Sequence, residues 1–435
     1  MKSVWRKGKK LPDFPRLDGN QKTDVLIIGG GMAGILCAHF LQEMGIDYML
    51  VERSTICSGV TKNTTAKITA QHGLLYHKLL KGAGRERAQL VLDANLRARD
   101  KYAELCQNID CDFEERTSYV YSTDNRKKLE QEAEALDKLG HPVSLVPTEE
   151  LPFPTVGALA FEGQAQFHPL RFAAQIAADL KIYEHTFVTE LKENTAVTNR
   201  GEIAFEKLII ATHFPMDNKH GMYFMKMYQH RSYVIALRNA ACIKGMYVDE
   251  KRTGLSFRSY RDFLLVGGGS HRTGKKGGCW QELRDFAKSC YPSSSETYHW
   301  ATQDCMTLDG IPYIGKYSKN MPHCFVAAGF NKWGMTSSMT AAMILADLVS
   351  GKENAYAQVF SPSRSMWKPQ LFLNGCEALV NLLSPARKRC PHMGCSLKWN
   401  GVEHSWDCPC HGSRFDEQGR LLDNPANGNL GKRRE

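Results

Sequence analysis

The C-terminal part of the chain gathers side chains that bind soft metal ions. The stretch from Arg389 to Phe415 contains four cysteines and three histidines. Their most regular feature is a pair of short motifs, Cys390-x-His392 and Cys408-x-x-His411. A structural zinc site normally combines CxxC and HxxxH pairs. One cysteine and one histidine from each of two loops instead suit an asymmetric cluster, with two thiolates on one iron and two imidazoles on the other.

This ligand set is that of a Rieske [2Fe–2S] site, with zinc as the alternative. The loops CPHMGC and CPCHGS closely resemble both cluster-binding loops of Rieske proteins. The resemblance makes Cys390, His392, Cys408 and His411 the cluster ligands. It also implies that Cys395 and Cys410 form a disulfide between the loops, although a reduced compartment would oppose one.

Three further positions bear on the cluster. Ser413 matches the family serine that hydrogen-bonds a bridging sulfide, and Phe415 stands where high-potential members carry a tyrosine. Without that hydroxyl donor the reduced cluster is less stabilised, so the potential should lie in the middle or lower part of the Rieske range of about −150 to +300 mV. His404 lies off the pattern, and we expect it at the surface.

A second motif lies near the N-terminus. VLIIGGGMAG carries Gly29-x-Gly31-x-x-Gly34 between an apolar strand and a helix, and Glu52 ends the next strand. The glycines let a pyrophosphate approach the helix N-terminus, and the carboxylate can accept the ribose hydroxyls. The pattern predicts a dinucleotide site but does not separate FAD from NAD.

Three further segments favour FAD. SGVTKNTTAKITAQHG, KLIIATHFP and LDGIPYIG followed by FVAAGFNKWGMTSSMTAAMILADL resemble, in order and spacing, the D-amino-acid oxidase and glycine oxidase family of FAD-dependent oxidoreductases. In that family a late helix points its N-terminus at the flavin, where its partial positive charge stabilises the reduced, anionic ring. The implied cofactor-binding residues are Gly29, Gly31, Gly34, Glu52, Arg53, Thr65, Ala66, Lys67, Val188, Thr212, Gly310, Gly329, Gly334, Met335 and Thr336.

The same resemblance suggests where a substrate would bind. Lys67, His72, Arg258 and Tyr260 are the candidate catalytic residues, and Arg231 and His271 are further candidate contacts. Arg258 could pair with a substrate carboxylate. The family's usual Arg-Pro before the TxDG turn is replaced by Asp304-Cys305, which weakens the case for an amino-acid-oxidase pocket. Cys305 is a minor candidate for a covalent flavin link.

The elements that must position these residues alternate between strands and helices. The sequence predicts strands at Val25–Ile28, Tyr48–Glu52, Leu208–Thr212, Phe263–Val266 and Cys324–Ala328, and helices at Arg85–Gln107, Arg126–Leu139, Ser337–Ser350 and Cys376–Leu383. A second glycine cluster, in LLVGGGSHRTGKKGG (Leu264–Gly278), is interpreted as a substrate-domain turn because no apolar helix follows it. We therefore do not expect NAD(P)H as a dedicated hydride donor.

The expected fold is an α/β FAD-binding (Rossmann-like) domain with an α+β substrate domain, plus a small, shortened β-rich Rieske lobe. The oxidoreductase should span residues 20–383, with FAD-binding parts at about 20–80, 150–215 and 300–351 and substrate parts at about 81–149 and 216–299. A connecting segment is expected at 352–385 and the Rieske lobe at 386–435. So short a lobe should lean on the flavoprotein body.

Composition constrains location and partners. The chain has 56 Lys and Arg against 46 Asp and Glu, a net charge of +10. We interpret most of this excess as charged side chains on the solvated surface. The basic N-terminus has no apolar h-region after it, and ten cysteines are scattered, so we expect a reduced, cytoplasmic protein. The run VLIIGGGMAGILC is broken by glycines, so no membrane span is expected. Nucleic acid is not an expected partner, because no aromatic-basic element supports it.

Both motifs together predict a two-electron to one-electron relay. The arrangement resembles bacterial FAD-dependent oxidoreductases with a C-terminal Rieske domain. It implies oxidation of an amine or amino acid by hydride transfer to flavin N5, with electrons passing singly through the cluster to a carrier such as ferredoxin or flavodoxin. The alternatives are a flavin-dependent reductase fed by the cluster, and a non-metabolic electron-transfer or redox-sensing module.

Overall fold

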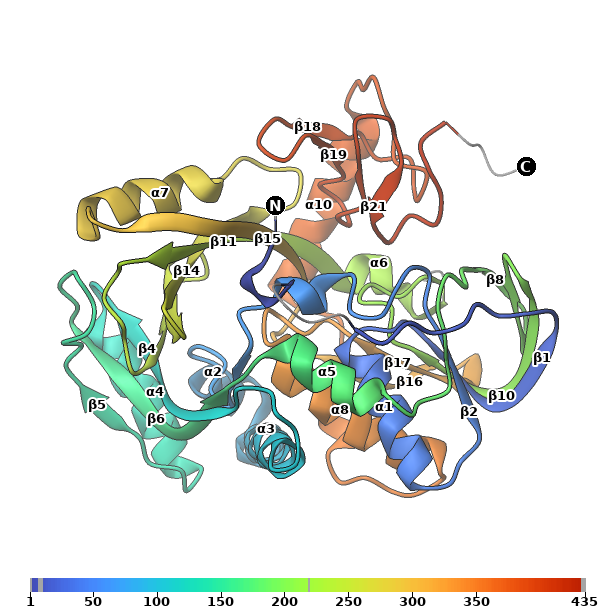
Figure 1. The fold of residues 1–435 in the computed structure, drawn as a ribbon, viewed down its shortest axis with the longest axis horizontal. Coiled ribbons are helices and arrows are strands. Elements are labelled where there is room, and N and C mark those ends of the chain that lie inside the picture. Colours follow the sequence, from blue (N-terminus) through green and yellow to red (C-terminus); the bar gives the residue numbers. More distant parts are fainter. Residues whose placement is uncertain (1, 7–10, 218–219, 432–435) are drawn as a thin grey trace.

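The computed structural model describes residues 2–6, 11–217 and 220–431, and Figure 1 shows its fold. Two large sheets form the body, and a small sheet forms the C-terminal lobe. Residues 432–435 of the expected lobe lie outside the described ranges. None of the helices in those ranges is both long and apolar enough to cross a bilayer.

The first sheet has eight strands in the order β16-β17-β10-β1-β2-β7, with β9 paired to β10 and β8 to β9. Its strands are β1 (Gln21–Ile28), β2 (Tyr48–Val51), β7 (Ile182–Tyr183), β8 (Val188–Leu191), β9 (Thr195–Thr198), β10 (Gly201–Ile210), β16 (Tyr313–Ser318) and β17 (Met321–Ala328). β1 lies parallel to both β2 and β10, and β10 is parallel to β17. β2 and the C-terminal ends of β1 and β10 are continuous buried apolar runs, as expected for strands covered on both faces.

Helices cover this sheet and supply its core. The helices of this part are α1 (Met32–Glu43), α5 (Pro169–Ala177) and α8 (Gly334–Val349). α1 packs against both α5 and α8, and their buried side chains belong to the largest apolar cluster of the molecule. The long α3 (Arg85–Cys106), with α2 (Tyr76–Ala83), packs against the same group.

The second sheet has nine strands in the order β15-β11-β14-β13-β12-β4-β6-β3, with β5 paired to β6. Its strands are β3 (Lys67–Ile68), β4 (Glu114–Ser122), β5 (Ser144–Val146), β6 (Gly157–Gln166), β11 (Met227–Arg238), β12 (Met246–Asp249), β13 (Ser256–Tyr260), β14 (Phe263–Arg272) and β15 (Ser295–Thr307). α4 (Arg126–Lys138) packs on β4, β5 and β6, and α7 (Cys279–Cys290) packs on β11 and β14.

Two details of this sheet differ from the sequence-based expectation. β6 and all of β15 belong to it, whereas the boundaries expected at about 150 and 300 assigned β6 and the second half of β15 to the FAD-binding part. The first three glycines of Leu264–Gly278 lie within β14 instead of in a turn, and two of them, Gly267 and Gly268, pair with Val234 and Tyr233 of β11. A Cβ on Gly267 would crowd Ser256 at 2.7 Å, so close strand packing explains this glycine.

The segment after α8 folds back on the body. It contains α9 (Ala357–Phe360) and α10 (Pro369–Leu383), and Arg364 pairs with Asp309, with Nε 2.7 Å from Oδ2. The helix expected at Cys376–Leu383 begins earlier, at Pro369, because proline is well suited to the first position of a helix. The short elements η1 (Val4–Arg6), η2 (Val60–Asn63), η3 (His220–Met222) and α6 (Tyr223–Lys226) complete the body.

The C-terminal lobe is a four-stranded antiparallel sheet. Its strands are β18 (Lys398–Asn400), β19 (Ser405–Asp407), β20 (Arg414–Phe415) and β21 (Leu421–Asp423). The lobe lies above β11 and β15 in Figure 1, and α10 runs up beside it. So small a sheet gains support from the body, as the chain length suggested.

Candidate active site and cluster-binding loops

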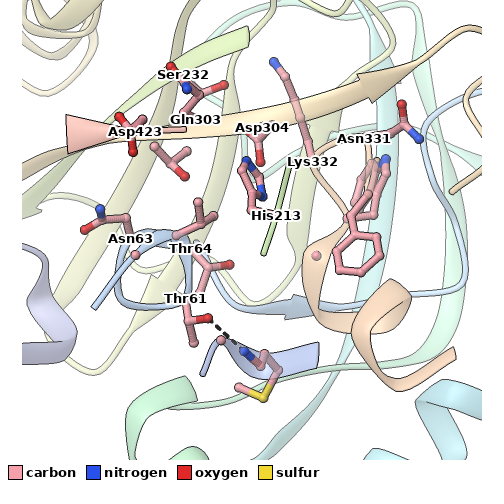
Figure 2. A pocket seen from close by; sticks show the side chains of 18 of the residues that line it. Thr61, Asn63, Thr64, His213, Ser232, Gln303, Asp304, Asn331, Lys332 and Asp423 are labelled. Atoms are coloured by element: carbon pink, nitrogen blue, oxygen red, sulfur yellow. Dashed lines mark hydrogen bonds between the residues drawn. The ribbon is translucent and has the colours of Figure 1, made fainter. Parts of the chain in front are cut away.

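One cavity of about 920 Å³ joins the two sheets and the lobe. Its wall includes the glycine motif after β1, the segment Val60–Thr65, the strands β11 and β15, and the turn before α8. The C-terminal lobe adds Glu403, Arg414, Leu422, Asp423, Asn424, Ala426 and Asn427. Figure 2 shows part of this wall, with Asp423 of the lobe bordering the same space as Asn63 and Gln303 of the body.

The glycine motif is built for close approach of a phosphate group. Gly29 has φ +113, and a Cβ there would lie 2.6 Å from the carbonyl oxygen of Ala211. Gly34 packs against the backbone of Gly29, where a side chain would collide. α1 begins at Met32, whose backbone amide donates to Thr61 Oγ1 at 3.1 Å, and its N-terminus faces the cavity. This cradle of backbone amides at a helix N-terminus fits the pyrophosphate of FAD.

Glu52 stands at the end of β2 on the cavity wall. Its carboxylate accepts hydrogen bonds from the backbone amides of Gly30 and Ser54, each at 2.8 Å. These bonds orient the carboxylate and leave lone pairs free for the ribose hydroxyls.

The turn before α8 closes another side of the cavity. Gly329, Asn331 and Lys332 all have positive φ, between +51 and +73. The Thr336 hydroxyl donates to the Thr69 carbonyl at 2.9 Å and accepts from the Thr69 amide at 3.1 Å. These bonds fix the N-terminus of α8 at the cavity, as required for a helix that stabilises a reduced flavin.

Most of the predicted cofactor-binding residues border the cavity. Those that line it are Gly29, Gly31, Glu52, Arg53, Thr65, Lys67, Val188, Thr212, Gly310, Gly334 and Met335. Gly34, Ala66, Gly329 and Thr336 lie behind the wall and shape the backbone. The donor set and the glycine cradle therefore fit FAD.

Lys67 and His72 are the two candidate catalytic residues that reach the cavity. Burial, with a smaller contribution from Arg258, lowers the pKa of Lys67 to about 7. His72 donates from Nε2 to the Thr69 carbonyl at 2.9 Å, and its ring stacks on Trp333 at 4.8 Å. Burial lowers the pKa of His72 to about 3, so this ring is neutral.

Arg258 and Tyr260 lie outside the cavity lining. Arg258 Nη1 donates to the carbonyls of Thr65 and Ala66 at 2.6 and 2.8 Å, so this arginine holds the segment that carries Lys67. Tyr260 donates to Asp112 Oδ2 at 2.6 Å. Both side chains therefore have partners within the protein, and their expected contact with a substrate stays a prediction.

Arg231 and His271 also have partners within the protein. Arg231 borders the cavity, but its guanidinium binds the buried carboxylate of Glu403 in the lobe. His271 Nε2 lies 3.0 Å from the Tyr233 hydroxyl, outside the lining. Cys305 is buried in the apolar cluster beneath the first sheet and does not border the cavity, so the structure does not support a covalent flavin link there.

Three cavity residues were not predicted. His213 is half-buried with φ +69, and its buried Nε2 has no hydrogen-bond partner among the described residues. Asp304 and Lys332 point into the cavity beside His213 (Figure 2). Burial raises the pKa of Asp304 to about 6, against the opposing effect of Lys332. His213 and Asp304 lay inside recognised segments, but sequence alone did not show that their side chains face the cavity.

The two cluster loops share one backbone pattern. The amide of Cys390 donates to Cys395 O and that of Gly394 to Cys390 O, each at 2.9 Å. The amides of Cys408 and Gly412 make the equivalent bonds to Ser413 O and Cys408 O, also at 2.9 Å. Two matched loops facing each other provide the paired ligand sets that a binuclear cluster needs.

The ligand side chains converge between these loops. Cys390, Cys408 and His411 are buried, and the rings of His392 and His411 lie 5.0 Å apart at 88°. His411 Nδ1 is buried with no hydrogen-bond partner among the residues that the structure describes, as expected of an atom reserved for metal. These side chains fit a [2Fe–2S] cluster, and we propose Cys390, His392, Cys408 and His411 as its ligands.

Cys395 and Cys410 occupy the expected positions for a bridge between the loops. Both are free thiols here, and their sulfur atoms lie within 4.8 Å of each other and of Cys408 Sγ. The disulfide remains a proposal supported by this proximity. Ser413 hydrogen-bonds the Cys390 thiol, Phe415 is fully buried beside the cysteines, and His404 pairs with Glu417 at the surface.

Two buried glutamines hold the second cluster loop on the body. Gln229 of β11 donates to the carbonyl of His411 at 2.7 Å, and Gln303 of β15 donates to that of Gly412 at 2.9 Å. Asn424 donates to the carbonyls of Thr212 and Phe214, each at 2.7 Å. The lobe therefore rests on the strands that also wall the cavity, and the expectation that it leans on the body is confirmed.

Comparison with known proteins agrees with these sites. Residues 24–348 match the family "FAD dependent oxidoreductase" (DAO), and residues 383–433 match the Rieske [2Fe-2S] domain. A protein of Bacillus subtilis (strain 168), YhfW, whose name describes a Rieske 2Fe-2S iron-sulfur protein, is 33% identical over 98% of this chain and 96% of its own. Gamma-glutamylputrescine oxidoreductase of Escherichia coli (strain K12) is 21% identical over 79% of this chain and 87% of its own.

Solved structures share the fold of the body. Glycine oxidase from Geobacillus kaustophilus superposes with a TM-score of 0.68 at 21% identity, over 80% of this chain and all of that one. The chain belongs to the DAO family of FAD-dependent oxidoreductases and carries a C-terminal Rieske domain. Its cofactors are accordingly FAD and a [2Fe–2S] cluster.

Proposed function

We propose that this protein oxidises an amine or amino acid at the C–H bond next to nitrogen, and passes the electrons singly through its Rieske cluster to an external carrier. The observation that carries the proposal is that one cavity is bordered both by the dinucleotide motif at Gly29 and by Asp423 of the Rieske lobe. The similar proteins include a gamma-glutamylputrescine oxidoreductase and a glycine oxidase, which supports an amine or amino-acid substrate.

When bound, FAD supplies a hydride acceptor and the cluster a one-electron carrier. The chain's own contribution is to prepare the amine. Lys67 has a pKa of about 7, so near neutral pH its amine can take the proton of a substrate ammonium and leave the nitrogen lone pair free. His72, neutral and stacked on Trp333, borders the same cavity. Arg258 holds the Lys67 segment in place.

The body also supplies a short connection between the two cofactor sites. His213 borders the cavity, and its neighbour Phe214 packs edge-on against the cluster-loop residue His411, with ring centroids 6.4 Å apart. The side chain of Gln303 borders the cavity and bonds the cluster loop directly. We propose that electrons leave the flavin side of the cavity by this route.

The potential of the cluster limits the choice of carrier. Plant-type ferredoxins lie near about −400 mV, below the Rieske range of about −150 to +300 mV. Transfer from cluster to such a ferredoxin is uphill by at least about 250 mV, an equilibrium unfavourable by roughly 10⁴ for one electron. A carrier of higher potential suits the oxidation, whereas a ferredoxin suits the reverse, reductive direction.

The test is an anaerobic titration of the holoprotein. A panel of amines and amino acids is added while visible absorbance follows the flavin and EPR follows the cluster. We expect one class of amine to bleach the flavin, after which a Rieske EPR signal grows. If no amine reduces the flavin but the chemically reduced cluster does, the result would instead support the alternative function, a flavin-dependent reductase fed by the cluster.

A further inference from the structure

Helix α10 presents most of its large apolar side chains to solvent, whereas it turns two asparagines and Leu371 toward the protein. Phe372, Leu379, Val380 and Leu383 are 61%, 59%, 60% and 75% exposed, whereas Asn374 and Asn381 are 7% and 3% exposed. The exposed positions follow the spacing i, i+7, i+8, i+11, so they form one stripe along the helix. A stripe of this kind on a soluble surface marks a binding site.

The hydrogen bonds of the inward polar face prevent α10 from rotating about its own axis. Asn374 Oδ1 accepts from Arg272 Nη1 at 3.1 Å, and its Nδ2 donates to the carbonyl of Met225 at 3.2 Å. The carbonyl of Asn381 accepts from the amide of Ser396 in the lobe at 2.9 Å. These bonds fix α10 between body and lobe, so its outward stripe is a built feature.

The stripe continues at both ends of the helix. Trp367, immediately before α10, is 78% exposed. At the other end, Arg389 Nη1 donates to the carbonyls of Leu382 and Gly394, at 3.0 and 2.9 Å, and so holds the first cluster loop beside the helix. Met393 of that loop is 42% exposed. Exposed apolar side chains therefore also stand on both sides of the helix, Trp367 before it and Met393 in the cluster loop.

Positive charge flanks this surface. Lys368 precedes the helix, and Arg387 and Arg389 follow it, both exposed. The only acidic residue within α10, Glu377, is 16% exposed and pairs with Lys275 at 2.7 Å. An apolar stripe with cations at both ends complements a surface of acyl chains beneath anionic headgroups.

We propose that α10 lies on an anionic lipid bilayer, with its apolar stripe in the boundary between headgroups and acyl chains. A transient electron-carrier interface is small and about as polar as the rest of a protein surface, so it does not require such a stripe. A second copy of the chain, paired antiparallel across a two-fold axis, would bring Lys368 of one helix toward Arg387 of the other. An anionic bilayer both requires an apolar stripe and attracts the positive charges at its ends.

The proposal does not depend on the direction of electron flow. It places the loop that carries His392, a partly exposed residue, at the membrane surface. The contact is peripheral, since among the helices described here none could span a bilayer.

Sedimentation of the holoprotein with lipid vesicles tests the proposal. The vesicles consist of phosphatidylcholine alone or mixed with phosphatidylglycerol. We expect binding to the mixed vesicles that weakens with added salt. The double variant Leu379→Ser, Leu383→Ser should bind at least roughly tenfold more weakly, because it loses two inserted side chains. Val402→Ser, which removes a 53% exposed apolar side chain elsewhere in the lobe, should bind like the wild type.

Three results would overturn the proposal. The first is no binding to either kind of vesicle, and the second is binding of the double variant as tight as that of the wild type. The third is a wild-type dimer, seen by analytical ultracentrifugation, that becomes a monomer in the double variant. The flavin and cluster spectra of the variants check that they fold, since all the replaced side chains are exposed. Amine turnover is not measured, so a failure here is distinct from a failure of the proposed oxidation.

Discussion

Arg231 of β11 and Glu403 of the Rieske lobe form a buried bidentate ion pair. Arg231 Nε donates to Glu403 Oε1 at 2.9 Å, and Nη2 donates to Oε2. Their side chains are only 4% and 1% exposed. Glu403 also accepts from Arg414 Nη2 at 3.0 Å and from the Tyr233 hydroxyl at 2.8 Å. The contact between flavoprotein body and lobe is therefore fixed by a satisfied polar network.

Glu403→Gln should loosen this contact, because Arg231 loses its carboxylate partner in a buried site, whereas Arg414 keeps Asp407 and Asp423. We expect a loss of about 3 kcal/mol in the free energy of unfolding, measured by urea denaturation. Limited proteolysis of the segment after α10 should show that the lobe is released more readily. Glu417→Gln, in the same lobe but paired with His404 at the surface, should change stability by less than about 1 kcal/mol. Equal effects of the two variants would contradict a special role of the buried pair.

The same ion pair should make the contact between the lobe and the flavoprotein body weaken at low pH. Burial alone would raise the pKa of Glu403, but the charges of Arg231 and Arg414 lower it to about 2, from an ordinary value of 4.5. The stabilisation is therefore complete above about pH 4.5 and is lost as the pH falls toward 2. Protease release of the lobe should be flat from pH 5 upward and rise below it, and an onset near neutral pH would exclude Glu403 as the cause.

Lys67→Met should slow reduction of the flavin by the amine roughly 100-fold, in the usual range for loss of a general base. In the wild type, the rate should rise as the pH passes about 7, because Lys67 loses its proton there. That limb should disappear in the methionine variant. Lys67→Arg retains a charge at all accessible pH values and should also be slow, so a fast arginine variant would remove Lys67 from the mechanism.

Gln303→Leu should slow electron transfer between the cofactor sites without slowing flavin reduction. It leaves the Gly412 carbonyl and Gln229 Oε1 without a donor, at a cost of about 1–3 kcal/mol each, and loosens the cluster loop. Stopped-flow absorbance separates the two steps. The control is Gln281→Leu, at an exposed position on α7. If Gln303→Leu left the second step unchanged, the proposed route would be wrong.

Phe415→Tyr should raise the reduction potential of the cluster. Phe415 is buried beside the cluster cysteines, and a hydroxyl there would donate to a sulfur and stabilise the reduced state. One hydrogen bond of about 1 kcal/mol corresponds to roughly 40 mV for one electron. Redox titration followed by EPR measures the shift. A lowered potential would show that the new hydroxyl points elsewhere.

The sequence by itself determined the two cofactor motifs. Gly29, Gly31 and Gly34 act through the backbone of one turn, and Cys390 and His392 act from one short loop. Their spacing along the chain therefore sets most of their geometry. The helices at α3, α4 and α8 were predicted within a few residues for the same reason, since helical periodicity is local.

Only the tertiary structure decided how the long polar side chains are used. Arg231 and Arg258 were expected to bind a substrate, but one pairs with Glu403 and the other with the carbonyls of Thr65 and Ala66. These partners come from segments more than a hundred residues away. A buried arginine binds whichever acceptor packing brings beside it, because leaving its charge unpaired is too costly. Sequence spacing does not contain that choice, and neither does it place Asp423 of the lobe in the wall of the flavin cavity.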